Sequence, residues 1–272
     1  MKIRLRRQKR PRLAVLHLNG VMSEEGDDPL PRRVNLALAE ARHFRARGLL
    51  VRINSPGGTV GATQEIYEAL LRFHDETKVP VVASLGEVAA SGGIYVAMAA
   101  ERVIANAGTI TGSIGVIIQS RNLSQLLGKV GVEMEVVKSG TFKDTLTYFR
   151  GITAAERNML QELINDSHEQ FVETVARGRK LAPEKVREFA DGRVMTGRQA
   201  LHHGLVDELG SFEAAVEAIK GLANLTMKPH LVEVGRMRKP WYERLTRRFL
   251  SQLDWEGASP RLRGIPLYLM PR

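Results

Sequence analysis

Short apolar segments alternate with helical segments through the first half of the chain, and this alternation limits the folds that the chain can form. Strands are predicted at residues 13–18, 49–53, 79–85, 102–105, 116–119 and 133–138. Helices are predicted at residues 32–47 and 60–76, after residue 93 up to about residue 100, and at 123–130. Strands and helices at this spacing are typical of βαβ units with right-handed crossovers. The sequence therefore predicts an α/β fold with a largely parallel sheet.

Two glycine-rich segments directly follow predicted strands. They are Asn-Ser-Pro-Gly-Gly at residues 54–58 and Ala-Ser-Gly-Gly at residues 90–93. In open parallel sheets, ligands and catalytic groups gather at the carboxyl ends of the strands. A backbone N–H of Gly58 and one of Gly92 can approach a substrate closely, because glycine has no Cβ in the way. Together they are candidates for a two-donor oxyanion hole.

Ser91 and Lys143 are the candidate catalytic pair. A serine hydroxyl needs a base to take its proton, and no histidine lies between His74 and His168. A lysine can replace the histidine, provided that its amine is held uncharged by burial. Thr141 and Phe142 precede Lys143 and allow such burial, whereas the adjacent Asp144 opposes it unless its carboxylate points elsewhere. Ser113 is the candidate for the hydrogen bond that orients the amine.

A long amphipathic helix is predicted at residues 153–179, where Thr153 and Glu156 fit a capping box. Shorter helices are expected at residues 183–190, 197–203 and 211–223, and the pattern is less regular after Met227. Apolar side chains recur every four residues between Trp241 and Leu253, with arginines among them. This segment suits either an amphipathic helix on a membrane surface or a helix packed on a neighbouring subunit.

The net charge of +10 is concentrated at the two ends of the 272-residue chain. Residues 1–12 hold seven Lys and Arg and no acid, and residues 226–272 hold ten against four acids. The part between them is slightly acidic, which is not the pattern of a nucleic-acid-binding face, so no nucleic acid partner is expected. Basic ends suit an anionic membrane surface, RNA or another acidic partner, or they simply solvate the chain ends.

Neither a secretion signal nor a membrane span is expected. The apolar stretch at residues 13–21 is short and holds His17 and Asn19, and the segment at 79–100 is broken by Pro80 and three glycines. The expected location is therefore peripheral to a membrane and otherwise cytoplasmic. The chain has no cysteine, which excludes disulfides and a thiolate nucleophile.

Four ordered motifs resemble the bacterial signal peptide peptidase A (protease IV) family in its short, single-repeat form. They are Ser-Pro-Gly-Gly at 55–58, Ala-Ala-Ser-Gly-Gly at 89–93, Thr-Gly-Ser-Ile-Gly-Val at 111–116 and Ser-Gly-Thr-Phe-Lys-Asp at 139–144. The step of 52 residues from Ser91 to Lys143 also matches, as does Ala-Asp-Gly-Arg-Val at 190–194. The similarity covers about residues 13–225.

This resemblance implies a ClpP/crotonase-like fold and a serine endopeptidase with a Ser91–Lys143 dyad. It also implies an oxyanion contribution near Gly58, assembly into a homo-oligomeric ring or dome, and cleavage of hydrophobic peptides such as released signal peptides. No cofactor or metal is expected. The predicted organisation is a basic tail at 1–12, a peptidase domain at 13–225 and a basic extension at 226–272. Family members usually carry a membrane anchor at the N-terminus, where this sequence shows only the basic segment at 1–12.

Other functions remain open on the sequence alone. A crotonase-type acyl-CoA enzyme would use the same oxyanion hole with Glu87 or Glu101 as base, and would leave Lys143 without a role. A ClpP-type triad would need a histidine 20–30 residues after Ser91, and the chain has none there. A non-catalytic scaffold of the same fold would organise membranes through the basic ends.

Overall fold

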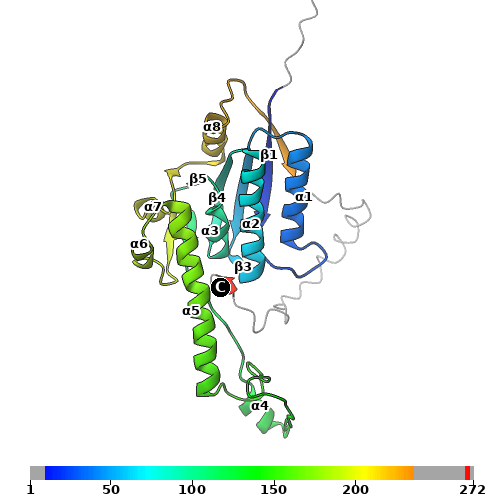
Figure 1. Cartoon of the computed structure of the whole chain (residues 1–272). Helices are drawn as coiled ribbons and strands as arrows, with labels where there is room; N and C mark the ends of the chain where they lie inside the picture. The colour runs from blue at the N-terminus through cyan, green and yellow to red at the C-terminus, as the bar shows by residue number, and fades with distance from the viewer. Residues whose placement is uncertain (1–9, 236–266, 270–272) are drawn as a thin grey trace, which may run out of the picture.

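The computed structural model describes residues 10–235 and 267–269, and within them a main sheet of eight strands forms the centre of the molecule (Figure 1). The strand order is β7-β6-β4-β2-β1-β9, with β5 beside β4 and β8 beside β5. The strands are β1 Arg12–Asn19, β2 Leu49–Ser55, β4 Val81–Ala90, β5 Arg102–Ala105, β6 Ile110–Gly112, β7 Val194–Thr196, β8 Glu208–Leu209 and β9 His230–Val234. All pairs in this sheet are parallel except β6 with β7, so the α/β expectation is confirmed.

The described helices cover both faces of this sheet, except for one short helix, Ser124–Lys129, that lies away from it (Figure 1). They are α1 Leu30–His43, α2 Val60–Thr77, α3 Gly92–Ala97, α4 Ser124–Lys129, α5 Ala154–Arg179, α6 Pro183–Arg187, α7 Gly197–His202 and α8 Phe212–Leu222. Alternate residues of β1 point to opposite faces, as in any strand. Ala14 and Leu16 belong to the larger core under α1, α2, α3 and α5, whereas Leu13 and Val15 belong to a smaller core with Ile219 of α8. None of the helices within residues 10–235 combines the length and the apolar character that a membrane crossing requires.

The segment at residues 133–138 is not a strand, although its alternating sequence predicted one. Val132, Met134 and Val136 are exposed, because this part of the chain has no neighbouring strand with which to pair. The prediction of a strand at residues 116–119 is also wrong. In contrast, β9 was not predicted. It lies beyond residue 225 and pairs with β1, with His230 opposite Arg12.

The long helix α5 joins the body of the molecule to a projecting segment. Its predicted capping box is present: Glu156 N–H donates to Thr153 Oγ1, and Thr153 N–H donates to Glu156 Oε2. The C-terminal half buries Phe171 and Val175 in the core, whereas the N-terminal half extends away from the sheet (Figure 1). At its far end it carries residues 120–153, here called the arm, which includes α4.

A second, two-stranded sheet lies near the carboxyl end of β2. It consists of β3 Gly57–Thr59 and β10 Leu267–Leu269, which run antiparallel (Figure 1). Met22 forms a parallel bridge to Gly58 and joins β3 to the loop after β1. The predicted amphipathic segment at 241–253 and most of the basic N-terminal tail lie outside the described residues.

Candidate active site

Ser91 occupies a strained turn between the carboxyl end of β4 and the start of α3. Its backbone has φ 53° and ψ −118°, a combination that a residue with a Cβ rarely adopts and that costs about 1–3 kcal/mol. The turn is held by two hydrogen bonds. Ser91 N–H donates to Gly112 O at 2.8 Å, and Tyr95 N–H donates to Ser91 O at 3.0 Å. Backbone strain that the surrounding structure maintains is typical of functional sites.

The neighbouring strands end at the same place. Ser55 at the end of β2 pairs in register with Ala89, and Ala90 pairs with Gly112 at the end of β6. The three motifs that follow these strands therefore meet at one edge of the sheet, as expected from the parallel topology.

The two glycines proposed for the oxyanion hole lie side by side. A Cβ on Gly92 would stand 3.1 Å from Gly58 N and 2.7 Å from Thr63 Oγ1, which leaves no room for a side chain. A Cβ on Gly58 would stand 1.8 Å from Met22 O, so only glycine fits there. The structure thus brings Ser91, Gly92 and Gly58 together, in the arrangement that a pair of backbone N–H donors beside a nucleophile requires.

The hydroxyl of Ser91 is buried, and its Oγ has no hydrogen-bond partner among the described residues. Leaving a buried polar group unpaired costs about 1–3 kcal/mol, so most such groups in native proteins find a partner. The unpaired hydroxyl at this strained turn makes Ser91 the candidate nucleophile of the site.

Ser113 lies next to this turn. It follows Gly112, which holds Ser91 N–H, and it too has a positive φ of 52°. Its own N–H donates to Arg193 O at 2.7 Å. A cavity of about 310 Å³ opens beside Ser113 and is lined in part by Val116, Ile164 and His168.

Lys143 is exposed in the arm, and its amine has no partner among the described residues. The side chain of Phe142 is also exposed, so the burial that the sequence suggested for this lysine is not provided by its own chain. Asp144 does not oppose it either: its carboxylate accepts from Lys138 Nζ at 2.5 Å and from Arg150 Nε at 3.0 Å. The hydrogen bond from Lys138, together with the one from Arg150, lowers the pKa of Asp144.

A buried ion pair fixes the arm to the start of α5. Arg150 donates two hydrogen bonds to Glu156, at 2.6 Å and 2.8 Å, and Thr145 Oγ1 donates to the same carboxylate at 3.1 Å. The contact with Arg150 holds the pKa of Glu156 well below its usual range. These hydrogen bonds hold the arm in a fixed position at the N-terminal end of α5.

The arm and Ser91 lie far apart within one chain. Phe171 of α5 packs on the ring of Tyr95, four residues after Ser91, with the ring centroids 5.1 Å apart. Glu156, which anchors the arm, lies fifteen residues earlier on the same helix, about 22 Å away along its axis. Thr145 Oγ1 donates to Glu156, so Lys143, two residues before Thr145, is held at that far end of α5, a separation that its side chain cannot span. The structure does not bring Lys143 to the Ser91 of its own chain.

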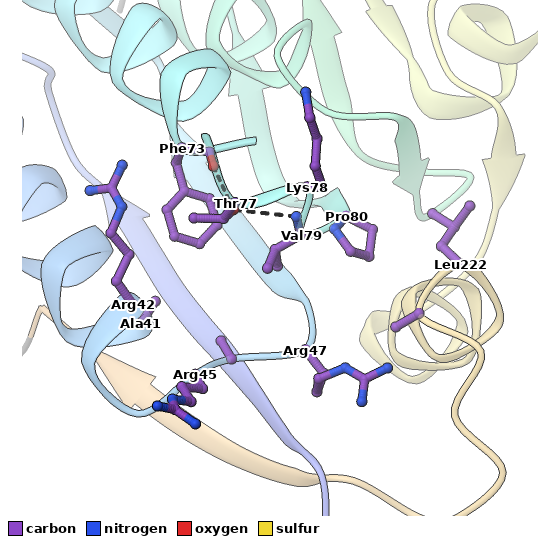
Figure 2. Close-up of a pocket in the computed structure, with 12 residues that line it drawn as sticks. Ala41, Arg42, Arg45, Arg47, Phe73, Thr77, Lys78, Val79, Pro80 and Leu222 are labelled. Atoms are coloured by element: carbon purple, nitrogen blue, oxygen red, sulfur yellow. Dashed lines mark hydrogen bonds between the residues drawn. The ribbon is translucent and has the colours of Figure 1, made fainter. Parts of the chain in front are cut away.

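The opposite end of the sheet holds a different surface. A hollow of about 490 Å³ lies where β2 and β4 begin, and Figure 2 shows Arg42, Arg45, Arg47 and Lys78 around it. An adjoining hollow shares two of these arginines and adds two more. We call this surface the basic pole; it consists of Arg10, Arg12, Arg42, Arg45, Arg47 and Lys78. It holds no nucleophile with a base, and residues 10–235 contain no cluster of three His, Asp or Glu that could bind a metal.

A family model described as peptidase family S49 matches residues 74–226, which is more than half of the chain and includes Ser91 and Lys143. The chain belongs to peptidase family S49. The expectation drawn from the four sequence motifs is thereby confirmed, and the protein is a serine-type peptidase.

Relatives of this S49 peptidase carry protease names. A protein of Synechocystis sp. that is named as a protease is 51% identical over 212 residues, which are 77% of this chain and 75% of that protein. The chloroplastic serine protease SPPA of Arabidopsis thaliana is 34% identical over 203 residues, 74% of this chain and 29% of that protein. Protease 4 of Salmonella typhi is 32% identical over 217 residues, 78% of this chain and 35% of that protein. The chain thus spans about a third of the last two relatives.

Solved structures share the fold of this S49 peptidase. A membrane-bound stomatin-specific protease aligns over 84% of this chain and all of that chain, with a TM-score of 0.57 and 12% identity. ClpP1 of Listeria monocytogenes aligns over 72% of this chain and 91% of that chain, with a TM-score of 0.49 and 18% identity. The alignment with the stomatin-specific protease confirms the expected fold class.

Two residues of the site were not found by sequence reasoning. Thr63 is fully buried against Gly92, and Met22 supports the backbone of β3. Thr63 could have been predicted to lie at the site, since it stands on the first turn of the helix that follows Ser-Pro-Gly-Gly. Met22 could not have been predicted, because it lies in a loop more than thirty residues from the motif that it supports.

Proposed function

We propose that this peptidase cleaves hydrophobic peptides, such as released signal peptides, with Ser91 as nucleophile and Lys143 as general base. The observation that carries the proposal is the unpaired, buried hydroxyl of Ser91, held in a strained turn beside Gly58 and Gly92. The two glycine N–H groups would bind the oxyanion, and the loss of one such donor typically costs ~3–4 kcal/mol of transition-state stabilisation.

The chemistry follows from these groups. The neutral amine of Lys143 takes the Ser91 proton as Oγ attacks the peptide carbonyl, and the resulting oxyanion is held by the N–H groups of Gly58 and Gly92. The ammonium then gives its proton to the leaving nitrogen as the peptide C–N bond breaks and the acyl-enzyme forms. A water molecule, deprotonated by the same amine, attacks the ester carbonyl, and the ammonium returns that proton to Ser91 Oγ as the ester C–O bond breaks. Ser113 orients the amine.

The dyad forms between neighbouring subunits in this proposal. Lys143 of one chain reaches Ser91 of the next because the arm projects from the body and cannot fold back to its own site. Exposed apolar side chains on the arm support this role, since such surfaces mark protein interaction sites. Val137 is fully exposed, and Phe142 and Tyr148 are 45% and 42% exposed. The unpaired segment at 133–138 offers a further edge for a neighbouring subunit.

The test is to mix two inactive variants, Ser91→Ala and Lys143→Ala. Each alone should lack turnover of a hydrophobic fluorogenic peptide. If Lys143 acts on a neighbour, co-refolded mixtures contain interfaces where an intact Ser91 meets an intact Lys143. Random assembly of equal amounts should restore roughly a quarter of the wild-type activity, since each half of a site is intact with even odds.

The outcomes of this mixing experiment are distinct. A dyad within one chain predicts no recovery at any ratio, because every subunit lacks one partner. Turnover by the Ser91→Ala protein alone would overturn Ser91 as the nucleophile. Labelling by a serine-directed fluorophosphonate provides a second readout. Ser91 should be labelled in the wild type, whereas a non-catalytic scaffold or an acyl-CoA enzyme that relies on a carboxylate base would leave it unlabelled.

The proposed setting is the surface of an anionic membrane, where released signal peptides reside. The basic pole supports it: six Lys and Arg side chains lie together at the end of the sheet opposite Ser91. Glu76 is the acid that pairs with one of them, Arg42, at 2.6 Å. The basic N-terminal tail leads into this same end of the sheet at Arg10, so its charge adds to that of the pole.

A further inference from the structure

A cavity opens at Ser113, the residue that lies next to the Ser91 turn. Its volume is about 310 Å³, and its wall includes the apolar side chains of Val116, Ile117 and Ile164. All three are only partly buried in the single chain. An apolar cavity of about 150 Å³ can bind benzene, so this cavity has room for an aromatic ring.

The titratable side chains of this cavity already have partners. His168 Nε2 lies 2.8 Å from Ala190 O. The carboxylate of Asp191 accepts hydrogen bonds from the guanidinium of Arg193. Because these groups are engaged, the cavity suits an apolar occupant better than a charged one.

The proposed dyad brings one apolar side chain to this place. Under the proposed function, Lys143 of a neighbouring subunit reaches Ser91, and Ser113 orients its amine. Consecutive Cα atoms lie about 3.8 Å apart, so Phe142 arrives beside Ser113 together with Lys143. The ring of Phe142 is exposed in the single chain. Aromatic side chains that fill a pocket on the partner are typical anchors of protein interfaces.

We infer that Phe142 of one subunit docks into the cavity at Ser113 of the next, and that this contact positions Lys143 at Ser91. The inference rests on the proposed function, because it uses the same contact between subunits. Phe142 is then a positioning residue, which acts through the lysine that follows it. A docked ring also excludes water from the amine beside it, and burial of this kind keeps a lysine uncharged.

Turnover by paired variants tests the contact. Phe142→Ala should lower kcat by roughly 10²-fold with little change in KM, since displacement of a catalytic group by about 1 Å has an effect of this size. Phe142→Leu keeps an apolar anchor and should restore most of the rate. Ile164→Ala widens the cavity and should lower kcat as well. Because the two side chains touch in this proposal, the double variant should be no slower than Phe142→Ala alone.

Leu126→Ala is the matched control for this comparison. Leu126 is an exposed apolar residue on α4 of the same arm, and any effect of its substitution should multiply with that of Ile164→Ala. If the effects of Phe142→Ala and Ile164→Ala multiply in the same way, the inference is wrong. It is also wrong if the cavity takes a substrate side chain, in which case Ile164→Ala changes KM and the preferred peptide without coupling to Phe142.

Mixed assemblies show which chain needs which side chain. In the mixture of Ser91→Ala and Lys143→Ala chains, each active site combines Lys143 of the first chain with Ser91 of the second. Phe142→Ala should therefore lower the recovered activity to near background when it is placed in the Ser91→Ala chain, and should have no effect in the Lys143→Ala chain. Ile164→Ala should show the reverse. Equal effects of Phe142→Ala in the two chains would overturn the inference.

The two proposals fail in different ways. If no activity is recovered from Ser91→Ala and Lys143→Ala chains that carry no further substitution, the dyad between subunits is wrong. If activity is recovered but does not depend on the chain that carries Phe142→Ala, the dyad stands and the docking of Phe142 is wrong.

Discussion

Lys143 is the residue on which the proposed chemistry depends most. Lys143→Ala should lower peptide turnover by at least roughly 10³-fold, and Lys143→Arg should not restore it, because a guanidinium stays protonated and cannot accept the serine proton. Wild-type activity should rise from neutral to alkaline pH as the amine loses its proton. The measurement is a pH–rate profile under conditions where chemistry limits the rate.

The control for this prediction is Lys129→Ala, which removes another exposed lysine from the arm. It should retain normal turnover. A wild-type rate that stays level from pH 6 to 10, or an active Lys143→Arg protein, would exclude the lysine as base.

Gly92 is expected to be required because a side chain would not fit there, and not because of the flexibility of its backbone. A Cβ there would meet Thr63 Oγ1 at 2.7 Å and Gly58 N at 3.1 Å, so Gly92→Ala must displace Thr63 and press on Gly58 N, one of the proposed oxyanion donors. We expect kcat to fall by roughly 10²–10³-fold. Gly61→Ala is the matched control, because a Cβ at Gly61 has open space around it. Full activity of folded Gly92→Ala protein, with an unchanged melting temperature, would contradict this arrangement of donors.

The site could be predicted in part from the sequence. The positions of Ser91, Gly58 and Gly92 at neighbouring strand ends follow from the parallel topology, which local patterns reveal. The separation of Lys143 from Ser91 could not be predicted, since it depends on the direction in which α5 leaves the body. The positive φ of Ser91 was equally hidden, because the turn is imposed by its contacts with Gly112 and Tyr95.

The arm should respond to acid through Glu156. Its pKa lies below the usual range in the folded chain because of Arg150, so the ion pair stabilises the arm at any pH above the ordinary carboxyl pKa of about 4.3. That stabilisation is lost as pH falls through the lower pKa of the folded state. Limited proteolysis across a pH series should therefore show arm cleavage at acidic pH before the core opens.

The matched variants are Glu156→Gln and Glu162→Gln, both on α5. Glu156→Gln removes the charge that Arg150 holds, and should expose the arm to protease at neutral pH and reduce activity. Glu162 is exposed on the same helix, and its substitution should change neither. Equal resistance of the two variants at neutral pH would show that the ion pair does not fix the arm.

Some helices, turns and strands could be predicted from the sequence and others could not. The capping box of α5 and the glycine-rich turns are local features, and the sequence predicts them well. The prediction of a strand at 133–138 was wrong. An alternating pattern indicates only that one face of the segment is apolar, and it does not indicate that a partner strand is present. β9 escaped prediction for the opposite reason: its pairing with β1 is a contact between residues more than two hundred positions apart.

The whole molecule has its basic pole and the candidate site around Ser91 at opposite ends of the sheet. We expect binding to vesicles that contain anionic lipid, with each Lys or Arg near the surface worth up to ~1 kcal/mol, and weaker binding as salt rises. Co-sedimentation measures it. Replacing Arg45 and Arg47 with Gln should weaken binding severalfold, and so should deletion of residues 1–9, which spares Arg12 and its pairing with His230.

The control for the vesicle experiment is Arg102→Gln, which removes a charge from β5, outside the basic pole. It should bind as the wild type does. Binding that requires no anionic lipid, or no binding of the full chain at low salt, would assign the basic pole to another partner.

The place of β10 in the fold has a practical consequence for anyone who purifies the protein. Leu269 stands opposite Gly57 in the pairing of β10 with β3. A histidine tag fused after residue 272 would begin a few residues from β3, whereas a tag fused before residue 1 would precede the start of β1 at Arg12. Rates measured on the two preparations should differ, and those from the N-terminally tagged protein should match the untagged chain.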